Sequence, residues 1–408
     1  MPKATPSTRL YDVILYGATG FVGRQTVTYF AEHAKDLRWA LAGRNAKKLE
    51  AIRREAGVTA LQAGIVVADS DDDGALNALA ASTCVVLSTA GPFAQFGSAL
   101  VAACVANGTH YVDITGETAW VRDMIDRHHD AAARSGTRIV PCCGFDSVPS
   151  DIGAWLVVQA MQAQHGETCA TVKASFTMRG GVNGGTLASG LNMIETGQSQ
   201  AMAKPFLLNP EGSIPTPHAI DEDPFAPHRD KDFKAWLGPF VMGTINTRVV
   251  RRSAALLGYG GKENTFHYQE YMRFGAGPLA AVAAAGFCAG MIQGNVAMRS
   301  SAVRALAKQC VPAPGSGPSE SAMDSGSFRC ELVGTSTSGN QVRVTVAGQG
   351  DPGNRATTKM VCEAAMALVR ETKRLPGGAR FGGVLTPASA LGDVLVERLQ
   401  GAGLTLER

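Results

Sequence analysis

The chain has 408 residues, a length that exceeds one small core and predicts two domains or one domain with a large insertion. Hydrophobic residues make up 45% and charged residues 18%, a composition that excludes an intrinsically disordered protein. The formal net charge is only +3, and no basic block interleaved with aromatic residues is present, so nucleic acid is not an expected partner. The nine cysteines lack the spacing of a metal site. Their spacing predicts no bound metal, while the odd number of cysteines and the absence of a signal peptide predict a reducing, cytoplasmic location.

The first 141 residues alternate short apolar segments with helical patterns. Six strands are predicted, at Asp12–Tyr16, Leu37–Ala42, Gly64–Ala68, Cys84–Ser88, His110–Asp113 and Arg138–Pro141. Five helices are predicted between them, at Phe21–His33, Ala46–Arg54, Asp72–Ala81, Ser98–Ala106 and Ala119–Ser135. This alternation predicts an α/β Rossmann domain, a doubly wound parallel sheet with the strand order 3-2-1-4-5-6.

The pattern then changes to that of a second, α+β domain built on a mixed sheet. Its strands are predicted at Val172–Met178, Glu263–Arg273, Ser327–Leu332 and Gln341–Ala347. Its helices are predicted at Leu187–Ala203 and Leu279–Ala307, with a long loop at Lys204–Asp232 and a surface segment at Val311–Gly326. The final helices are predicted at Asn354–Lys373 and Ala388–Gln400. We expect a dinucleotide-binding domain at 1–150, a substrate and dimerisation domain at 151–380, and a C-terminal helical segment at 381–408 that returns to the first domain.

A glycine-rich loop links the first strand to the first helix. Its residues are Gly17, Ala18, Thr19, Gly20, Phe21, Val22 and Gly23. Gly17 allows a tight turn, Gly20 lets the backbone approach a pyrophosphate, and Gly23 lets the helix pack against the strand. The helix start offers free N–H groups and a partial positive charge to the phosphates. The loop therefore predicts a dinucleotide cofactor.

The end of the second strand indicates which dinucleotide is bound. An acidic residue here would hold the ribose 2′-hydroxyl of NAD, but Arg44 occupies the position. A guanidinium pairs well with a 2′-phosphate, so NADP(H) is the expected cofactor. Asp69, after the third strand, is expected either to meet the adenine edge or to cap the helix that begins near Asp72. The loop Thr89, Ala90, Gly91 and Pro92, after strand four, is expected to face the nicotinamide half.

The combination of these segments resembles the saccharopine dehydrogenase-like oxidoreductases. The likeness is carried by Gly17–Gly23, Ala42–Arg44, Thr89–Phe93 and Tyr111–Glu117. Three further segments are similar to the trans-acting enoyl reductase branch of that group, namely Cys143–Asp151, Gly184–Ser189 and Gly383–Pro387. The resemblance runs over nearly the whole chain, and its most specific part is Gly144–Asp151.

This resemblance implies an NADPH-dependent reductase of lipid metabolism. Its substrate would be a lipid-like enoyl thioester supplied by a polyketide or fatty-acid synthase. Two alternatives stay open, an amino-acid dehydrogenase of the saccharopine type and a lipid-associated protein that binds the cofactor without turnover. Anionic amino-acid substrates would need paired cations, and Arg248, Arg251 and Arg252 form the only tight cluster, which is also consistent with an ordinary surface.

Hydride transfer also needs a proton donor, and the carboxyl ends of strands five and six offer candidates. We expect Tyr111, Glu117 and Asp146 to be catalytic, with Asp113 as a further candidate. A structural role is an alternative for each of them. Asp146, or the nearby Ser150 or Asp151, is also suited to cap the helix that follows.

A stretch without charged residues, Phe274–Met298, is long enough to span a bilayer. Its Gly, Asn, Gln and Pro residues instead favour a helix packed on the second sheet. Part of this helix is expected to be exposed toward lipid or toward another subunit. We therefore expect a homodimer, with peripheral membrane contact left open.

Overall fold

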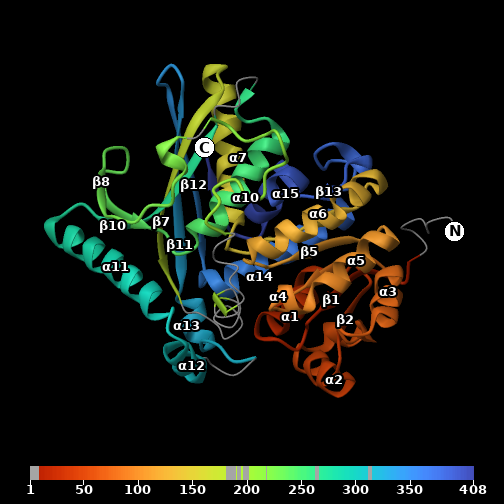
Figure 1. The fold of residues 1–408 in the computed structure, drawn as a ribbon. Helices are drawn as coiled ribbons and strands as arrows, with labels where there is room; N and C mark the ends of the chain where they lie inside the picture. The colour runs from red at the N-terminus through yellow and green to blue at the C-terminus, as the bar shows by residue number, and fades with distance from the viewer. Residues whose placement is uncertain are drawn as a thin grey trace.

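The computed structural model describes residues 9–180, 190, 194–195, 202–216, 218–261, 266–310 and 315–408. The described chain forms two seven-stranded sheets with helices packed around and between them (Figure 1). The predicted helix at Leu187–Ala203 falls largely outside the described residues, and the segment Gly184–Ser189 falls entirely outside them.

The first sheet is parallel throughout and has the strand order β13-β6-β5-β4-β1-β2-β3. Its strands are β1 (Tyr11–Tyr16), β2 (Trp39–Gly43), β3 (Gly64–Val67), β4 (Thr83–Ser88), β5 (His110–Asp113), β6 (Arg138–Val140) and β13 (Gly383–Val384). Its helices are α1 (Phe21–His33), α2 (Ala46–Glu55), α3 (Asp73–Ser82), α4 (Phe93–Phe96), α5 (Ser98–Asn107) and α6 (Thr118–Ser135). The predicted Rossmann class and the order of its six strands are confirmed. The seventh strand, β13, comes from the C-terminal part of the chain.

Successive residues of β1 point to opposite faces of this sheet, because the side chains of a strand alternate. Ile14 and Tyr16 pack in a core with α3, α5 and α6. Val13 and Leu15 pack in the other core, which includes α14 (Thr357–Arg370). The strand is apolar on both faces because helices cover both.

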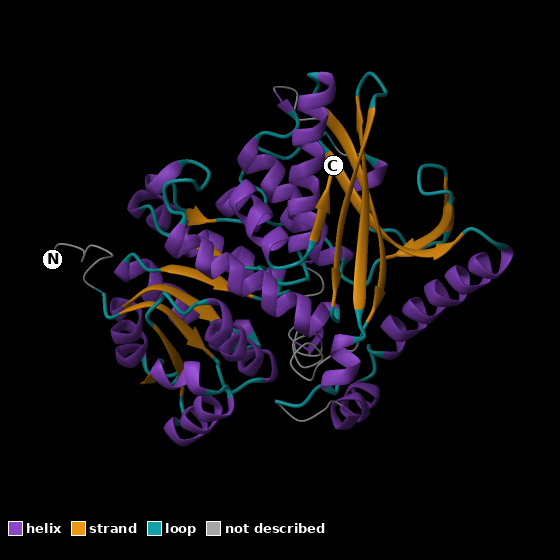
Figure 2. Cartoon of the chain, turned by 180° about the vertical axis from the view of Figure 1, so that it is seen from behind, coloured by secondary structure: helices purple, strands orange, loops and turns teal. Residues whose placement is uncertain are grey.

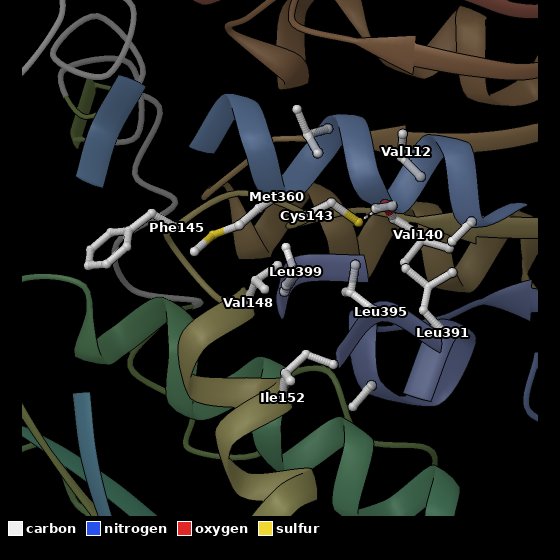
Figure 3. Close-up of a cluster of buried hydrophobic side chains, with 14 of the residues drawn as sticks. Val112, Val140, Cys143, Phe145, Val148, Ile152, Met360, Leu391, Leu395 and Leu399 are labelled. Atoms are coloured by element: carbon white, nitrogen blue, oxygen red, sulfur yellow. Dashed lines mark hydrogen bonds between the residues drawn. The ribbon is translucent and has the colours of Figure 1, made fainter. Parts of the chain in front are cut away.

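That second core continues without a break into the rest of the molecule. It joins the first sheet to α14, to α7 (Val148–His165) and to α15 (Pro387–Gly401). Figure 3 shows its centre, where Met360 of α14 lies between Phe145, Val148 and the side chains of α15. The two sheets are therefore held together by a shared hydrophobic core, which positions the start of α7 beside the first sheet.

The second sheet is mixed and has the strand order β14-β12-β11-β7-β10-β9-β8. Its strands are β7 (Cys169–Arg179), β8 (His228–Asp230), β9 (Ala235–Pro239), β10 (His267–Gly275), β11 (Ser327–Ser336), β12 (Gln341–Gln349) and β14 (Thr405–Glu407). Only β7 and β10 pair in parallel. The four predicted strands are present, while β8, β9 and β14 were not predicted because they are short. β8 lies inside the segment that was expected to be a loop.

A helix that was not predicted, α10 (Gly243–Leu257), carries the arginine cluster into the protein interior. Arg248, Arg251 and Arg252 are at most 1% exposed, so the interpretation of this cluster as a surface was wrong. Their guanidinium groups donate to backbone carbonyls of residues 202–208. These buried charges therefore hold a loop in place.

The uncharged stretch forms α11 (Pro278–Ala297), which contacts β9 and β10 as expected. The predicted helix at Leu279–Ala307 is in fact two helices, because the chain turns at residues 298–300 and continues as α12 (Ser301–Cys310). On α11 only Ala284 and Cys288 are buried, so the exposure expected for part of this helix extends over most of it. Among the described residues, α11 alone is long and apolar enough to cross a membrane by length and composition. Figures 1 and 2 both place it at the outer side of the second sheet.

A further short helix, α13 (Glu320–Asp324), lies inside the segment predicted to be an irregular surface, and single 3-10 turns form at Val58–Gln62, Ala219–Asp221 and Gly378–Arg380. Residues 311–314 of that segment lie outside the described residues. A short π-helical turn, Pro352–Ala356, leads into α14, close to the predicted start at Asn354.

Candidate functional site

In the glycine-rich loop, one glycine leaves the position of a Cβ atom more open than the other two. A Cβ atom on Gly17 would lie 2.8 Å from the Ala90 nitrogen, and Gly17 has a φ of +85°. A Cβ on Gly23 would lie 2.2 Å from the Gly17 carbonyl oxygen, so both glycines are required by packing. A Cβ on Gly20 would meet only the Gly17 oxygen, at 3.3 Å. The open side of this loop is therefore at Gly20.

No side chain of the described residues caps the start of α1 at Gly20, and the first turn of this helix contains no acidic residue. Ala18 and Val22 are buried, whereas Thr19 and Phe21 are half-buried beside the open position. Uncapped N–H groups and a partial positive charge suit the phosphates of a dinucleotide. These residues fit the predicted cofactor.

Arg44 is exposed at the end of β2 and forms no hydrogen bond or ion pair with any described residue. Its neighbour Asn45 caps α2 by accepting from the Lys48 backbone N–H at 3.0 Å. The guanidinium is therefore free to bind a 2′-phosphate near the start of α2. The cap of α3 is Asp72, so the interpretation of Asp69 as that cap was wrong. Asp69 accepts weakly from the Asp71 backbone N–H at 3.3 Å and is half-buried.

The loop after β4 lies directly against the glycine-rich loop. The Thr89 hydroxyl donates to the Gly17 carbonyl at 3.2 Å, and the Thr89 N–H donates to the Tyr16 carbonyl at 2.9 Å. A side chain at Gly17 would clash with Ala90. The loop continues through Gly91 and Pro92 into α4. The predicted cofactor-contacting segments therefore come together at one edge of the sheet.

Glu117 supports this loop from the end of β5. Its Oε1 accepts from the Phe93 N–H at 2.8 Å, and its Oε2 accepts from the Ala94 N–H at 3.0 Å. The carboxylate is fully buried, and it satisfies two N–H groups at the start of α4. This arrangement gives Glu117 a positioning role, with both of its oxygens occupied.

Tyr111 and Asp113 lie on β5 in the interior, and neither is exposed. Asp113 Oδ1 accepts from the backbone N–H groups of Thr115 and Cys142, each at 3.0 Å. It thereby ties together the loops that follow β5 and β6, and Cys142 adopts a φ of +62° there. The Tyr111 hydroxyl and Asp113 Oδ2 have no hydrogen bond of ordinary geometry. Burial raises the pKa of Asp113 to about 7.

The first turn of α7 is held by side chains from the second half of the chain. The Ser147 hydroxyl donates to Asn246 Oδ1 at 3.2 Å, and the Ser150 hydroxyl donates to Glu270 Oε2 at 2.7 Å. Ser147 is the N-cap residue, but its side chain forms no cap hydrogen bond. The hydrogen bonds of these two serines therefore hold the start of α7 against α10 and β10.

Asp151 is likewise used in packing between elements. Its Oδ2 accepts from the Ala388 N–H at 2.8 Å, at the start of α15, and its Oδ1 accepts from the Ser253 hydroxyl. The expectation that Asp146, Ser150 or Asp151 caps α7 was wrong, because no side chain caps this helix. Asp151 instead supports the start of α15.

Asp146 differs from every other polar residue of this turn. It forms no hydrogen bond or ion pair with the described residues, and it is partly exposed. Its Oδ2 would lie 3.7 Å from a Cβ on Gly116, in the loop after β5, and Cδ1 of Ile245 in α10 would lie 3.0 Å from the same position. Burial raises its pKa from 3.8 to about 7. The group can therefore carry a proton near neutral pH at the edge where the cofactor segments meet.

Sequence analysis did not identify Asn246 or Glu270, which are both fully buried. No signal in the sequence indicated them, because β10 (His267–Gly275) and the first half of α10 also contain other polar residues, and only the structure shows that Glu270 and Asn246 are buried. Among the described residues, no group of three or more His, Cys, Asp or Glu side chains is arranged to hold a metal ion.

Comparison with known proteins adds to this geometry. Residues 13–140 match the saccharopine dehydrogenase NADP binding domain family, so the dinucleotide site takes NADP(H). A trans-acting enoyl reductase of Mycobacterium bovis is 37% identical, covering 98% of this chain and 98% of the relative. A Mycobacterium tuberculosis protein, provisionally named as another trans-acting enoyl reductase, is 40% identical over 99% of this chain and 98% of its own length.

Among solved structures, apo saccharopine dehydrogenase (L-Glu forming) of Saccharomyces cerevisiae has the same fold, with a TM-score of 0.53. It is only 13% identical, while 97% of this chain and 99% of that chain are covered, so the likeness concerns the fold alone. The identity to the mycobacterial proteins over the full length is decisive for the family. The chain belongs to the trans-acting enoyl reductases, a branch of the saccharopine dehydrogenase-like oxidoreductases.

Proposed function

We propose that this protein is an NADPH-dependent reductase of the carbon–carbon double bond in a lipid-like enoyl thioester. The observation that carries the proposal is the Asp146 carboxyl group, which has no hydrogen-bond or ion-pair partner among the described residues and has a pKa of about 7. It lies at the sheet edge that also holds Gly20, Thr89 and Gly116. A reductase of this type needs a proton donor beside the cofactor, and Asp146 meets that need.

Bound NADPH supplies the hydride that the reaction adds to the β-carbon of the substrate. Asp146 holds a proton below about pH 7 and donates it to the α-carbon, where negative charge develops. The products are the saturated thioester and NADP⁺, and Asp146 regains a proton from solvent on its exposed side. Glu117 keeps the loop from Thr89 to Pro92 in place, and Arg44 selects the 2′-phosphate.

Asp146 is a better donor than the other two predicted catalytic residues. Both oxygens of Glu117 accept backbone hydrogen bonds, so neither is directed toward a substrate. Tyr111 is 0% exposed, and burial raises the pKa of its hydroxyl well above the ordinary value. We propose that Glu117 and Tyr111 shape the site and that Asp146 transfers the proton.

The test replaces Asp146 with asparagine, which keeps the size of the side chain but carries no acidic proton. NADPH oxidation is followed with a long-chain trans-enoyl thioester of coenzyme A or of N-acetylcysteamine. We expect kcat to fall by about 10²–10⁴-fold while the Kd for NADPH stays unchanged. In the parent enzyme kcat should fall as the pH rises through about 7, because the donor loses its proton.

Asp146→Asn with the kcat of the parent enzyme would contradict the role of Asp146. Turnover of saccharopine with NADP⁺, and none of the enoyl thioester, would favour the amino-acid dehydrogenase instead. NADPH binding without turnover of either compound would favour the cofactor-binding protein.

We also propose that this enzyme is cytoplasmic and that a polyketide or fatty-acid synthase supplies its substrate. We further propose that it forms a homodimer, in which the outer face of α11 is the contact between the subunits. Gly286, Gly290 and Gly294 recur every four residues on the exposed side of α11, and a Cβ on any of them would meet no atom within 4 Å. Large apolar side chains flank them, with Leu279 at 84% and Val282 at 69% exposure. Small residues at this spacing allow two helices to approach closely, and the stretch holds no charge that would be repelled by its copy.

Gly290→Leu tests this contact, because a bulky side chain at the middle glycine would block a close approach of two helices. We expect a dimer for the parent protein and a monomer for the variant in analytical ultracentrifugation. Ala285→Leu is the control, because Ala285 is exposed on the same helix but lies off the glycine ridge. A monomeric parent that sediments with anionic phospholipid vesicles would favour membrane contact, and Gly290→Leu would then strengthen sedimentation.

A further inference from the structure

A buried carboxyl group, Glu270, lies behind the start of α7. It is 0% exposed on β10 and receives hydrogen bonds from three different side chains. Asn246 donates to Oε1 at 2.8 Å, while Ser150 and Tyr268 donate to Oε2 at 2.7 and 2.8 Å. No cation of the described chain forms an ion pair with it. Burying an acidic side chain this way is costly, so its hydrogen bonds must carry a structural or functional benefit.

Two of the three donors, Ser150 and Asn246, link β10 to the segment that carries Asp146, while Tyr268 lies on β10 itself. Ser150 belongs to the first turn of α7 and contacts Glu270 directly. Asn246 reaches the same turn through Ser147, whose hydroxyl donates to its Oδ1 at 3.2 Å. Two routes therefore run from Glu270 to the residues that follow Asp146, one through Ser150 and one through Asn246. Both routes cross from the second sheet to the edge of the first.

We propose that Glu270 is a positioning residue, which fixes the first turn of α7 through Ser150 and Asn246 and so aims the Asp146 carboxyl group at the substrate. The proposal rests on the proposed function, in which Asp146 donates the proton. Within the described part of the chain the Asp146 side chain forms no hydrogen bond, so its direction depends on how firmly the adjoining turn is held. A displacement of about 1 Å in a catalytic group can cost roughly 10²-fold in rate.

The experiment compares four variants in the enoyl thioester assay, with Asp146→Asn measured in parallel. Ser150→Ala removes one link, and Glu270→Met removes all three hydrogen bonds at similar size. Glu270→Gln keeps the connections, because its amide can accept from Asn246 and donate to a hydroxyl oxygen. Ser175→Ala is the matched control, because the Ser175 hydroxyl is buried on the neighbouring strand β7 without a hydrogen-bond partner.

We expect kcat to fall by about tenfold or more in Ser150→Ala and by about 10²-fold in Glu270→Met. The KM for NADPH should stay at the parent value in both, and Glu270→Gln and Ser175→Ala should keep the parent kcat. If Glu270→Met does not fold, the comparison of kcat between Ser150→Ala and Ser175→Ala decides whether the link to Glu270 positions Asp146. A lower melting temperature with unchanged kcat in Ser150→Ala would overturn the proposal, and so would a loss of kcat in Glu270→Gln equal to that in Ser150→Ala.

The two proposals fail in different ways. If Asp146→Asn keeps full kcat, the proton donor is wrong, whatever Ser150→Ala does. If Asp146→Asn loses activity while Ser150→Ala and Glu270→Met do not, the donor stands and the positioning role of Glu270 is wrong.

Discussion

The Glu117 carboxylate accepts a hydrogen bond of 2.8 Å from the backbone N–H of Phe93, 24 residues earlier in the chain. The bond joins the end of β5 to the loop after β4, which lies against the glycine-rich loop. A buried negative charge at the start of a short helix satisfies N–H groups that would otherwise be unpaired. The loop proposed to face the nicotinamide is therefore held in place by a fully buried residue.

Glu117→Gln should destabilise the protein by about 1.5–3 kcal/mol, the usual contribution of a hydrogen bond to a charged group. In glutamine, the NH2 of the side-chain amide would replace one carboxylate oxygen and would face the N–H of Phe93 or Ala94, where only a hydrogen-bond acceptor fits. Chemical denaturation measures the stability, and NADPH titration should show weaker binding. Parent stability together with parent affinity would show that the Glu117 charge is dispensable for the loop.

Arg44→Ala should reduce the preference for NADPH over NADH. Loss of one charge-assisted contact is worth about 1.5–3 kcal/mol, or roughly ten- to hundredfold in the Kd for NADPH, with little change for NADH. Arg54→Ala is the control, since Arg54 is a 72% exposed cation at the other end of α2. Equal affinity of the parent for the two cofactors would refute the selection by Arg44.

Gly20→Val should abolish NADPH binding and leave the fold intact. The backbone of Gly20 has a φ of −72°, which any residue adopts, and its Cβ position is open toward the proposed pyrophosphate. Gly23→Ala should instead unfold the protein, because its Cβ would lie 2.2 Å from the Gly17 carbonyl oxygen. Circular dichroism and NADPH titration distinguish the two effects. Normal NADPH binding by Gly20→Val would place the phosphates elsewhere.

Asp151 should make the protein less stable as the pH rises. Burial raises its pKa from 3.8 to about 7 in the folded protein, so folding favours the protonated form. This stabilisation is complete below about pH 4 and is lost as the pH rises through about 7, with a slope of at most about 1.4 kcal/mol per pH unit.

The measurement is the free energy of unfolding between pH 5 and 8, compared for the parent and Asp151→Asn. Asparagine can accept from the Ala388 N–H and donate to Ser253, so the variant should fold. Its stability should depend less steeply on pH than that of the parent. Identical slopes would mean that Asp151 does not titrate in this window.

Local patterns in the sequence determined the first domain and its cofactor loops. The spacing of Gly17, Gly20 and Gly23, the position of Arg44 and the alternation of short strands with helices act over a few residues. The physical causes of these patterns are local as well. They are the backbone freedom of glycine, the hydrogen bonding at helix starts and the periodicity of side chains. The Rossmann class and the order of six strands could therefore be predicted.

The tertiary structure alone decided what the polar residues near the site do. Asp146, Ser150 and Asp151 stand within six positions, yet Ser150 is bonded to a residue 120 positions away and Asp151 to one 237 positions away. Which of them keeps a free carboxyl depends on these distant partners, and short-range patterns carry no information about them. For the same reason the arginines of α10 proved to be buried, and α11 proved to be exposed. Burial depends on what the rest of the chain packs against, and neither composition nor periodicity specifies that.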